Sequence, residues 1–303
     1  MKGRGIIALL CAGAFAAGAG GCASGQRRAP FGIATTSMAV CQILDRLNID
    51  DVVGIPSAAE DIELPERYKD VRTIGGAMAP DMEILSQINP EVVIVPRTLE
   101  AGLSAQFVNA GLNARYFDLS DVEGMYDDID ALGEEYGRQA EAAALREEYE
   151  AYVEENRVQS DDPATVLVLM AYPGRFYLIV TADSYVGNLI SLAGGVNVYD
   201  ENYVSDGSGV AAVNTEHMIQ TDPDKILVFA HYDEENAFKY MREEIETGEI
   251  WQNFRAVREG EVYWLSSDDG FGMSANLGWF ESFDFLTDTV FSDGESGTDS
   301  GAE

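Results

Sequence analysis

Two side chains with metal-ligand chemistry stand where strands are expected to end. Met78 lies between a short strand predicted over 71–74 and a helix for which Pro80 suits the first position. His231 directly follows the apolar run 226–230 in the second half of the chain. Ligands bind at the carboxyl ends of strands in open α/β sheets. We therefore expect the thioether and the imidazole to face a ligand from two parts of the fold.

A methionine and a histidine together suit the iron of a haem, because they can hold a six-coordinate iron from both faces. They do not suit zinc, since a closed zinc site takes four ligands and the chain has two histidines and no paired thiols. The other histidine, His217, falls in the first turn of a short predicted helix, where we expect it to be solvated. The alternatives are core packing for Met78 and a structural hydrogen bond for His231.

A haem slot needs flat apolar walls, and four aromatic residues near the predicted loops could supply them. They are Tyr172, Phe176, Tyr232 and Phe271. Aromatic side chains are more often part of a core, so each residue alone carries little weight. Met273 lies in the same glycine-rich turn as Phe271, and packing is a simpler interpretation for it than a third axial ligand.

Two predicted helix starts could receive the carboxylates of a ligand. Thr36, Ser37 and Met38 end the first strand and open the first helix, so they offer backbone N–H groups and hydroxyls to an anion. The glycine-rich segment 268–277 leads into the last predicted helix, with Ser274 as its N-cap. A capped loop without a ligand explains this second segment equally well.

The sequence lacks the motifs of common enzymes and of cysteine-based metal sites. Gly-x-Ser-x-Gly, the P-loop lysine motif and His-Glu-x-x-His are absent, and 272–276 resembles a nucleophile elbow only superficially. Of the three cysteines, Cys11 leaves with the predicted signal, Cys22 is the predicted lipid site, and Cys41 falls in a predicted helix as a small buried hydrophobe. This count excludes a cysteine-based zinc or iron–sulfur site.

The amino-terminal residues resemble a bacterial export signal. After a basic start, the apolar run 6–17 is too short to span a bilayer, and small residues at 18–21 lead to Cys22. The pattern is similar to the lipobox of bacterial lipoproteins, although Ala19 replaces the usual leucine. The alternative is an ordinary secretory signal cut nearby. We predict a signal peptide over 1–22 and lipidation at Cys22, which would hold the protein at a membrane surface.

Charge and composition narrow the partners. Acidic residues outnumber basic ones by 53 to 19, giving a formal charge of −34, which argues against nucleic acid and anionic lipid surfaces. The tail 292–303 is small and acidic with no apolar anchor, so we predict that it is disordered.

Short β-branched runs alternate with helical patterns from Phe31 onward, which is typical of parallel α/β units. We predict two Rossmann-like lobes, over 31–120 and 163–291. The first has strands over 32–35, 52–55, 71–74, 92–95 and 115–119, and helices over 38–47, 81–88 and 99–110. The second has strands over 165–171, 176–181, 226–230 and 262–265, and helices over 185–193, 216–220, 234–246 and 274–291.

A proline-free stretch, 121–158, carries apolar residues at near-helical spacing and acidic residues elsewhere. We predict a single long α-helix within a connecting segment, 121–160, whose acidic face is simply solvated. Two lobes joined by one rigid helix would leave a ligand cleft between them.

A set of segments resembles the haem-receptor lipoproteins of the Isd type, which are class III substrate-binding subunits of ABC importers in the helical-backbone receptor superfamily. The segments run in family order over nearly the whole mature chain: 35–40 with 43–47, 53–56, 64–71, the Met78 loop, 214–216, 226–231 and 271–277. The resemblance implies that Met78 and His231 are the axial ligands of a haem iron.

One departure from the family concerns the propionate groups of the haem. Relatives tend to carry a tyrosine and a lysine near the propionates in the loop where this chain has Ser57 and Ala58. The departure shifts the predicted anchoring of the propionates towards the backbone amides of Thr36, Ser37 and Met38.

The resemblance also implies a docking role for Glu83 and Glu216. In related binding proteins each lobe presents an acidic side chain that pairs with arginines of the permease, and these two residues fall at corresponding places. The alternative is that each carboxylate only stabilises the start of its helix.

We therefore expect a monomeric receptor, lipid-anchored at the outer face of the cytoplasmic membrane, that captures haem and delivers it to a permease with its ATPase. An upstream haem-donor protein would be a further partner. The first alternative is a siderophore- or cobalamin-binding receptor of the same fold. The second is an exported haem-modifying or hydrolytic enzyme.

Overall fold

Four short parallel strands form the sheet of the N-terminal lobe, in the order β2-β1-β5-β6. The structure, a computed structural model, describes residues 31–57, 64–174, 176–200, 209–230 and 232–292. The strands are β1 (Ile33–Thr35), β2 (Val52–Gly54), β5 (Val92–Pro96) and β6 (Ala114–Phe117), and the helices are α1 (Met38–Arg46), α2 (Met82–Ile88) and α3 (Glu100–Ala110).

The central strand β5 shows why this lobe has helices on both faces. All five of its residues are buried, as expected for a parallel strand covered on both sides. Val92 and Ile94 pack into one cluster with α1, whereas Val93 and Val95 pack into another with α2 and α3. Alternate side chains of one strand thus join two cores.

The C-terminal lobe has a mixed sheet in the order β10-β8-β7-β11-β12, with β9 also paired to β7. Here β11 is parallel to β7 and β12, while β8 is antiparallel to β7. The strands are β7 (Thr165–Tyr172), β8 (Phe176–Val180), β9 (Val196–Asn197), β10 (Val210–Ala211), β11 (Lys225–Ala230) and β12 (Val262–Leu265). The helices are α6 (Tyr185–Ala193), α7 (Thr215–Thr221), α8 (Glu234–Thr247), α9 (Arg255–Glu259) and α10 (Trp279–Phe285), the last continued by a π-helix (Leu286–Val290).

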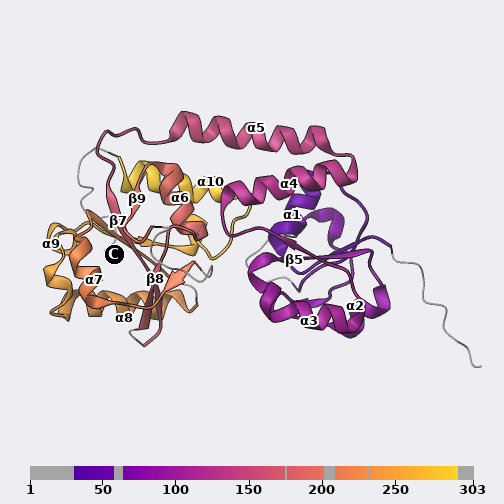
Figure 1. Ribbon diagram of the computed structural model, residues 1–303, viewed down its shortest axis with the longest axis horizontal. Helices are drawn as coiled ribbons and strands as arrows, with labels where there is room; N and C mark the ends of the chain where they lie inside the picture. The colour runs from indigo at the N-terminus through magenta and orange to yellow at the C-terminus, as the bar shows by residue number, and fades with distance from the viewer. Residues whose placement is uncertain (1–30, 58–63, 175, 201–208, 231, 293–303) are drawn as a thin grey trace, which may run out of the picture.

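The prediction of one continuous helix over 121–158 is wrong. The segment forms two helices, α4 (Val122–Tyr136) and α5 (Gln139–Asn156), which fold back on each other as an antiparallel hairpin (Figure 1). Gly137 ends α4 in a left-handed conformation with φ of 67°, which a glycine adopts without strain. Gly133 allows the close approach, since a Cβ there would stand 2.6 Å from that of Ala142. Both helices lie along one edge of the molecule, and α5 leads the chain into the C-terminal lobe.

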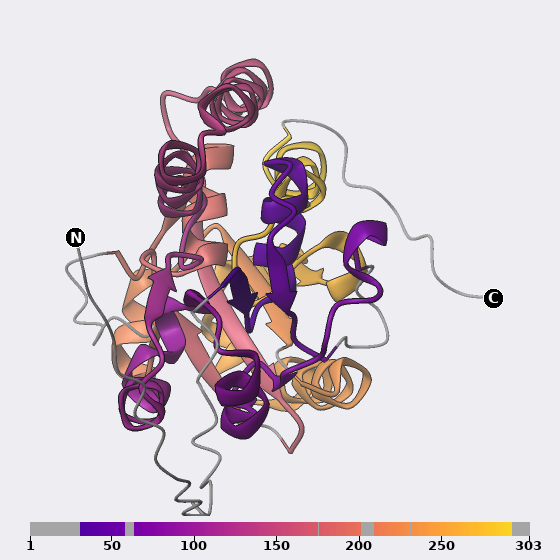
Figure 2. The same ribbon diagram turned by 90° about the vertical axis from the view of Figure 1, so that its right-hand side faces the viewer.

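Six aromatic side chains fasten α10 to the α4–α5 hairpin. We call them the aromatic seam: Tyr126, Tyr149, Tyr152, Trp279, Phe280 and Phe283. The Tyr126 and Tyr149 rings stack at 4.6 Å, and the Trp279 indole N–H donates to the Tyr126 hydroxyl at 3.2 Å. Figure 2 shows the hairpin and α10 lying above the two sheets. The seam belongs to a core cluster that contains residues of both lobes.

Polar contacts add to this connection between the lobes. Asn188 of α6 accepts a hydrogen bond from the Val122 N–H at 3.0 Å and donates to the Glu123 carboxylate at 2.7 Å. The Ala275 N–H donates to the Leu119 carbonyl at 2.8 Å. Residues 271–278 are consequently a loop that contacts the other lobe. The prediction that Ser274 is a helix N-cap is wrong, because the last helix begins only at Trp279 after Gly278.

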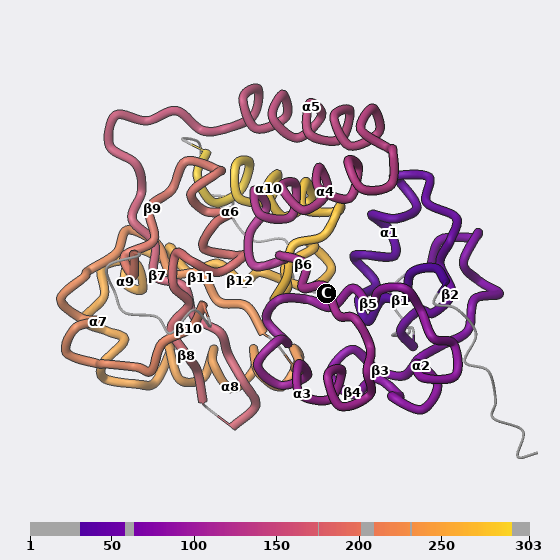
Figure 3. Tube along the Cα trace, turned by 45° about the vertical axis from the view of Figure 1, so that its right-hand side comes forward, coloured from indigo at the N-terminus to yellow at the C-terminus, as the bar shows by residue number. Residues whose placement is uncertain are grey.

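Figures 1 and 3 show α4 and α5 along one edge of the molecule and α2, α3 and α8 along the opposite edge. We call the first the hinge side. None of the helices among the described residues has the length and apolar character needed to cross a membrane. The predicted signal peptide, Cys22 and almost all of the predicted acidic tail lie outside these residues.

Candidate functional site

Met78 lies at the tip of a two-stranded hairpin formed by β3 (Gly75–Gly76) and β4 (Ala79–Pro80). Gly76 pairs with Ala79, so Ala77 and Met78 form the turn, and the Met78 side chain is 72% exposed. Gly75 has a φ of +89°, and a Cβ there would meet backbone atoms at 3.0 Å. The hairpin thus holds the thioether away from the core, and the core-packing alternative does not apply.

The chain around the hairpin differs locally from the prediction. The predicted strand 71–74 is reduced to a single bridge between Ile55 and Thr73. Pro80 lies in β4 rather than in the first turn of α2. Asp81 is the N-cap instead, because its carboxylate accepts the N–H groups of Glu83 and Ile84, each at 2.9 Å.

The predicted second ligand, His231, lies outside the described residues. Its position in the chain is nevertheless defined, because β11 ends at Ala230 and α8 begins at Glu234. Phe229, near the carboxyl end of β11, lines a pocket together with Thr98 and Ser120 of the other half of the molecule. This strand end therefore lies at the junction of the two lobes, as the sequence predicted.

The pocket at this junction has a volume of about 140 Å³ and contains residues from both lobes. Met273, a predicted pocket residue, is among them. The others are Thr98, Ser120, Val180, Asp183, Ser184, Tyr185, Val186, Gly209, Val210, Phe229, Gly272 and Ser274. The sequence analysis missed Thr98 and Ser120, although both closely follow strands of the N-terminal lobe, the signal that found Met78.

Exposed apolar side chains concentrate among the predicted pocket residues. Tyr232 is exposed to 73%, and Phe176 and Met273 are also exposed. Phe176 packs against Tyr172 with 5.3 Å between ring centroids. Large exposed apolar side chains of this kind can contribute area to a ligand. Phe271 differs from the prediction, because it is buried and packs edge-on against Phe285, and so it supports the loop from within.

The start of α1 is partly occupied by its own hydrogen bonds. The Thr36 N–H donates to the Ile94 carbonyl at 3.0 Å, and the Ser37 N–H donates to the Thr35 hydroxyl at 3.1 Å. The prediction that these two amides bind a propionate is therefore wrong. Among the described residues, the N–H groups of Met38 and Ala39 meet no acceptor, and the buried Thr36 hydroxyl has no partner. An anion would therefore bind one residue further along than predicted.

Ser57 and Ala58 were predicted to lie near the same carboxylates. The Ser57 N–H donates to the Gly75 carbonyl at 2.9 Å, which ties this residue to the base of the Met78 hairpin. Ala58 lies outside the described residues.

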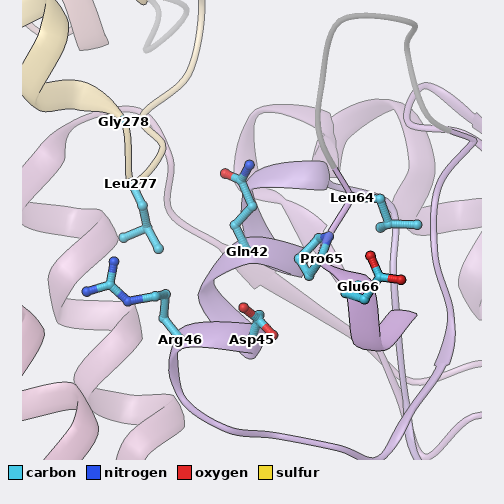
Figure 4. A pocket seen from close by; sticks show the side chains of 8 residues that line it. All are labelled: Gln42, Asp45, Arg46, Leu64, Pro65, Glu66, Leu277 and Gly278. Atoms are coloured by element: carbon cyan, nitrogen blue, oxygen red, sulfur yellow. The ribbon is translucent and has the colours of Figure 1, made fainter. Parts of the chain in front are cut away.

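A larger pocket of about 390 Å³ is separate from these residues (Figure 4). It is lined by Gln42, Asp45, Arg46, Leu64, Pro65, Glu66, Leu277 and Gly278. Its charged side chains already pair with residues outside the lining: Arg46 with Glu148 at 3.2 Å and Asp45 with Arg67 at 2.8 Å. It includes no predicted ligand residue, so we do not assign the ligand to it.

The remaining candidates fall at helix starts or in the core. Glu83 and Glu216 are both exposed, in the first turns of α2 and α7. The prediction that His217 is solvated is wrong. Its side chain is half-buried, and its ring lies edge-on to that of Tyr199 with 5.2 Å between the ring centroids. Cys41 is fully buried, which raises the pKa of its thiol to about 12 and confirms it as a packing residue. The described residues contain no group of three or more histidine, cysteine or carboxylate side chains that could hold a metal.

Comparison with known proteins decides the family. A model of the periplasmic binding proteins matches residues 33–268. The chain belongs to this family. It is 31% identical over 269 residues to the high-affinity haem uptake system protein IsdE of Staphylococcus aureus, covering 87% of this chain and 88% of that protein.

Two solved structures agree with this assignment. An ABC transporter substrate-binding protein from Listeria monocytogenes superposes with a TM-score of 0.78 at 35% identity, covering 88% of this chain and all of that one. The S. aureus IsdE complex with haem superposes with a TM-score of 0.75 at 31% identity, covering 86% and 98%. The predicted class III fold and the predicted family resemblance are confirmed.

Proposed function

We propose that this protein is an extracytoplasmic receptor that binds haem between its lobes and delivers it to an ABC permease. The observation that carries the proposal is the Met78 hairpin, which presents an exposed thioether from a glycine-built turn. The similarity to the haem complex of IsdE supports haem as the ligand. A thioether in this position suits a haem iron, which takes methionine as an axial ligand.

Met78 and His231 are the proposed axial ligands. Each lobe contributes one, so the iron is held from both faces and the porphyrin lies in the junction between the lobes. Tyr172, Tyr232 and Met273 supply apolar area along the porphyrin, worth about 25 cal/mol for each Å² that the ligand buries. The N–H groups of Met38 and Ala39 supply the partial positive charge that attracts a propionate.

The proposed activity is binding without turnover. The relatives are, by name, a haem uptake protein and a substrate-binding protein. Delivery requires a permease and its ATPase, on which Glu83 and Glu216 would dock the two lobes. Cys22 would carry the lipid that keeps the receptor, as a monomer, at the outer face of the cytoplasmic membrane.

A titration with haemin tests this function directly. Purified protein that lacks residues 1–22 should shift the haemin Soret band and give the visible bands of a low-spin six-coordinate iron at one haem per chain. Cobalamin and a ferric siderophore serve as competitors and should not displace the haem. A protein that leaves the haemin spectrum unchanged but binds either competitor would overturn the proposal. Loss of bound haem absorbance on adding a reductant would instead favour a haem-modifying enzyme.

A further inference from the structure

Arg97 occupies a distinctive place among the cationic side chains. It directly follows β5, and in the described part of the chain no other lysine or arginine directly follows a strand. Parallel strands end at one edge of their sheet, which is the edge where ligands bind in α/β folds. This position gives Arg97 a reason to be considered that a surface arginine elsewhere would lack.

The guanidinium of Arg97 is held in place by its own lobe. Its Nε donates to the Asp118 carboxylate at 3.1 Å and its Nη2 to the Tyr116 carbonyl at 3.3 Å. Asp118 in turn accepts from the Ser120 N–H and hydroxyl at 3.0 and 2.5 Å. Burial would raise the pKa of Asp118, but the bonds from Ser120 and Arg97 outweigh it and lower the pKa, so the carboxylate stays ionised.

One edge of the guanidinium is left for another anion. Nη1 donates to none of the described residues, and the Arg97 side chain is 51% exposed. The neighbours Thr98 and Ser120 both line the pocket between the lobes. Arg97 therefore directly precedes a residue of this pocket, pairs with a carboxylate that also bonds Ser120, and keeps one nitrogen that donates to no described residue.

The C-terminal lobe presents acidic side chains near its strand ends, so a cation at Arg97 matters more for an anionic ligand. The segments after β11 and β12 carry Asp233, Glu235 and Asp268, all exposed. The whole chain has a formal charge of −34, so a ligand with carboxylate groups is repelled almost everywhere. Arg97 offers such a ligand a cation whose position is fixed by its ion pair with Asp118.

We propose that Arg97 binds a propionate carboxylate of the haem and so determines which edge of the porphyrin faces the N-terminal lobe, an inference that rests on the haem-binding function proposed above. A guanidinium held on one side by Asp118 can still offer a fork of donors to a second carboxylate. Arg97 then selects for porphyrins with free propionates.

The test compares haemin with haemin dimethyl ester, whose propionates carry no charge. Arg97→Gln should weaken haemin binding by about three- to tenfold, the range of a partly exposed charge-assisted hydrogen bond. Its affinity for the dimethyl ester should equal that of the wild type, because the axial ligands and the apolar walls are unchanged. Arg97→Lys should recover part of the loss, since it keeps the charge but not the fork.

Arg46→Gln is the matched control. Arg46 lies in the same lobe, also has a side chain 51% exposed, and also pairs with one carboxylate, Glu148 at 3.2 Å, but lies at the end of α1 towards α5. Its loss should alter neither affinity.

Three outcomes would overturn the inference. An Arg97→Gln protein that keeps the wild-type preference for haemin over the ester would exclude a contact with a propionate. Failure of the wild type to bind either porphyrin would overturn the proposed function, and the role of Arg97 with it. If Arg97→Gln weakened the binding of haemin and of the ester equally, Arg97 would act on the fold rather than on the carboxylate. Melting curves of the Arg97→Gln and Arg46→Gln proteins would show this.

Discussion

The hinge side of this molecule and the side that presents Met78 and Tyr232, which we call the ligand side, use the same residue types in opposite ways. The aromatic seam on the hinge side has Trp279 fully buried and its rings stacked or edge-on to one another. On the ligand side, Met78 and Tyr232 are each exposed by more than 70%. Both regions are rich in large apolar side chains, yet only one of them contributes its apolar area to the fold.

The difference separates stability from binding. In the seam the polar tips are satisfied internally: the Trp279 N–H donates to Tyr126, and the Tyr152 hydroxyl donates to Asp284 at 2.6 Å. On the ligand side the apolar area is still in contact with water, so a flat ligand can gain the free energy of burying it. Substitutions should therefore change folding on one side and ligand affinity on the other.

The largest expected effect is from Trp279→Ala in the seam. Removing a fully buried indole leaves a cavity and an unpaired Tyr126 hydroxyl, and should lower the free energy of unfolding by about 3 to 5 kcal/mol. Chemical denaturation measures this directly. Tyr232→Ala is the matched change on the ligand side and should stay within about 0.5 kcal/mol of the wild type. Similar losses in the two variants would erase the distinction between the regions.

His231→Ala should have the largest effect on the bound haem. Without the imidazole the iron should lose its low-spin spectrum, and haem should dissociate more readily. His217→Ala provides the control, because that ring packs against Tyr199 and has no proposed contact with haem. If His217→Ala alone abolished the low-spin bands, the wrong histidine would have been assigned.

Met78→Ala should change the coordination of the iron more than the affinity for haem. The exposed thioether supplies one axial bond, whereas the apolar walls supply much of the buried area. Absorption spectra should shift towards a five-coordinate or water-bound iron while most of the haem remains bound. An unaltered spectrum would remove Met78 from the site.

Charge reversal at both Glu83 and Glu216 should affect neither region but should reduce haem transport in cells. Both side chains are exposed, and a charge at the rim of an interface acts on association with its partner. The purified Glu83→Lys/Glu216→Lys protein should still bind haem, with at most about 1 kcal/mol lost at each helix start. Transport at the wild-type rate would end the docking hypothesis.

The smallest expected effect is on overall dimensions. The seam packs α10 against the α4–α5 hairpin in a core cluster that contains residues of both lobes, so we expect little closure when haem binds. Small-angle scattering should give nearly the same radius of gyration with and without haem. A marked compaction would show that the seam is not rigid.

Local sequence patterns predicted most elements of the fold. The predicted bounds 185–193 coincide with α6. Ser184 before it and Gly194 after it are residues that typically cap the two ends of a helix. The same kind of signal at Gly137 was available but was outweighed by the helical spacing on both sides of it. Ser274 was mistaken for a cap because the loop that contains it is held by Leu119, 156 residues earlier in the chain.

For the candidate site, the sequence by itself determined the residue types and their order. It supplied a thioether and an imidazole after strands of different lobes, the glycines that shape the Met78 hairpin, and the family to which the chain belongs. These features depend on neighbours in the chain, so they can be read from short patterns.

Only the tertiary structure decided which apolar side chains remain exposed. It also decided that Phe271 is buried and His217 half-buried. It decided as well that Arg97 pairs with Asp118, 21 residues later in the chain. Burial depends on contacts between distant parts of the chain, such as Tyr126 with Trp279, which lie 153 residues apart. No local pattern records such a contact, because its free energy exists only once both partners are in place.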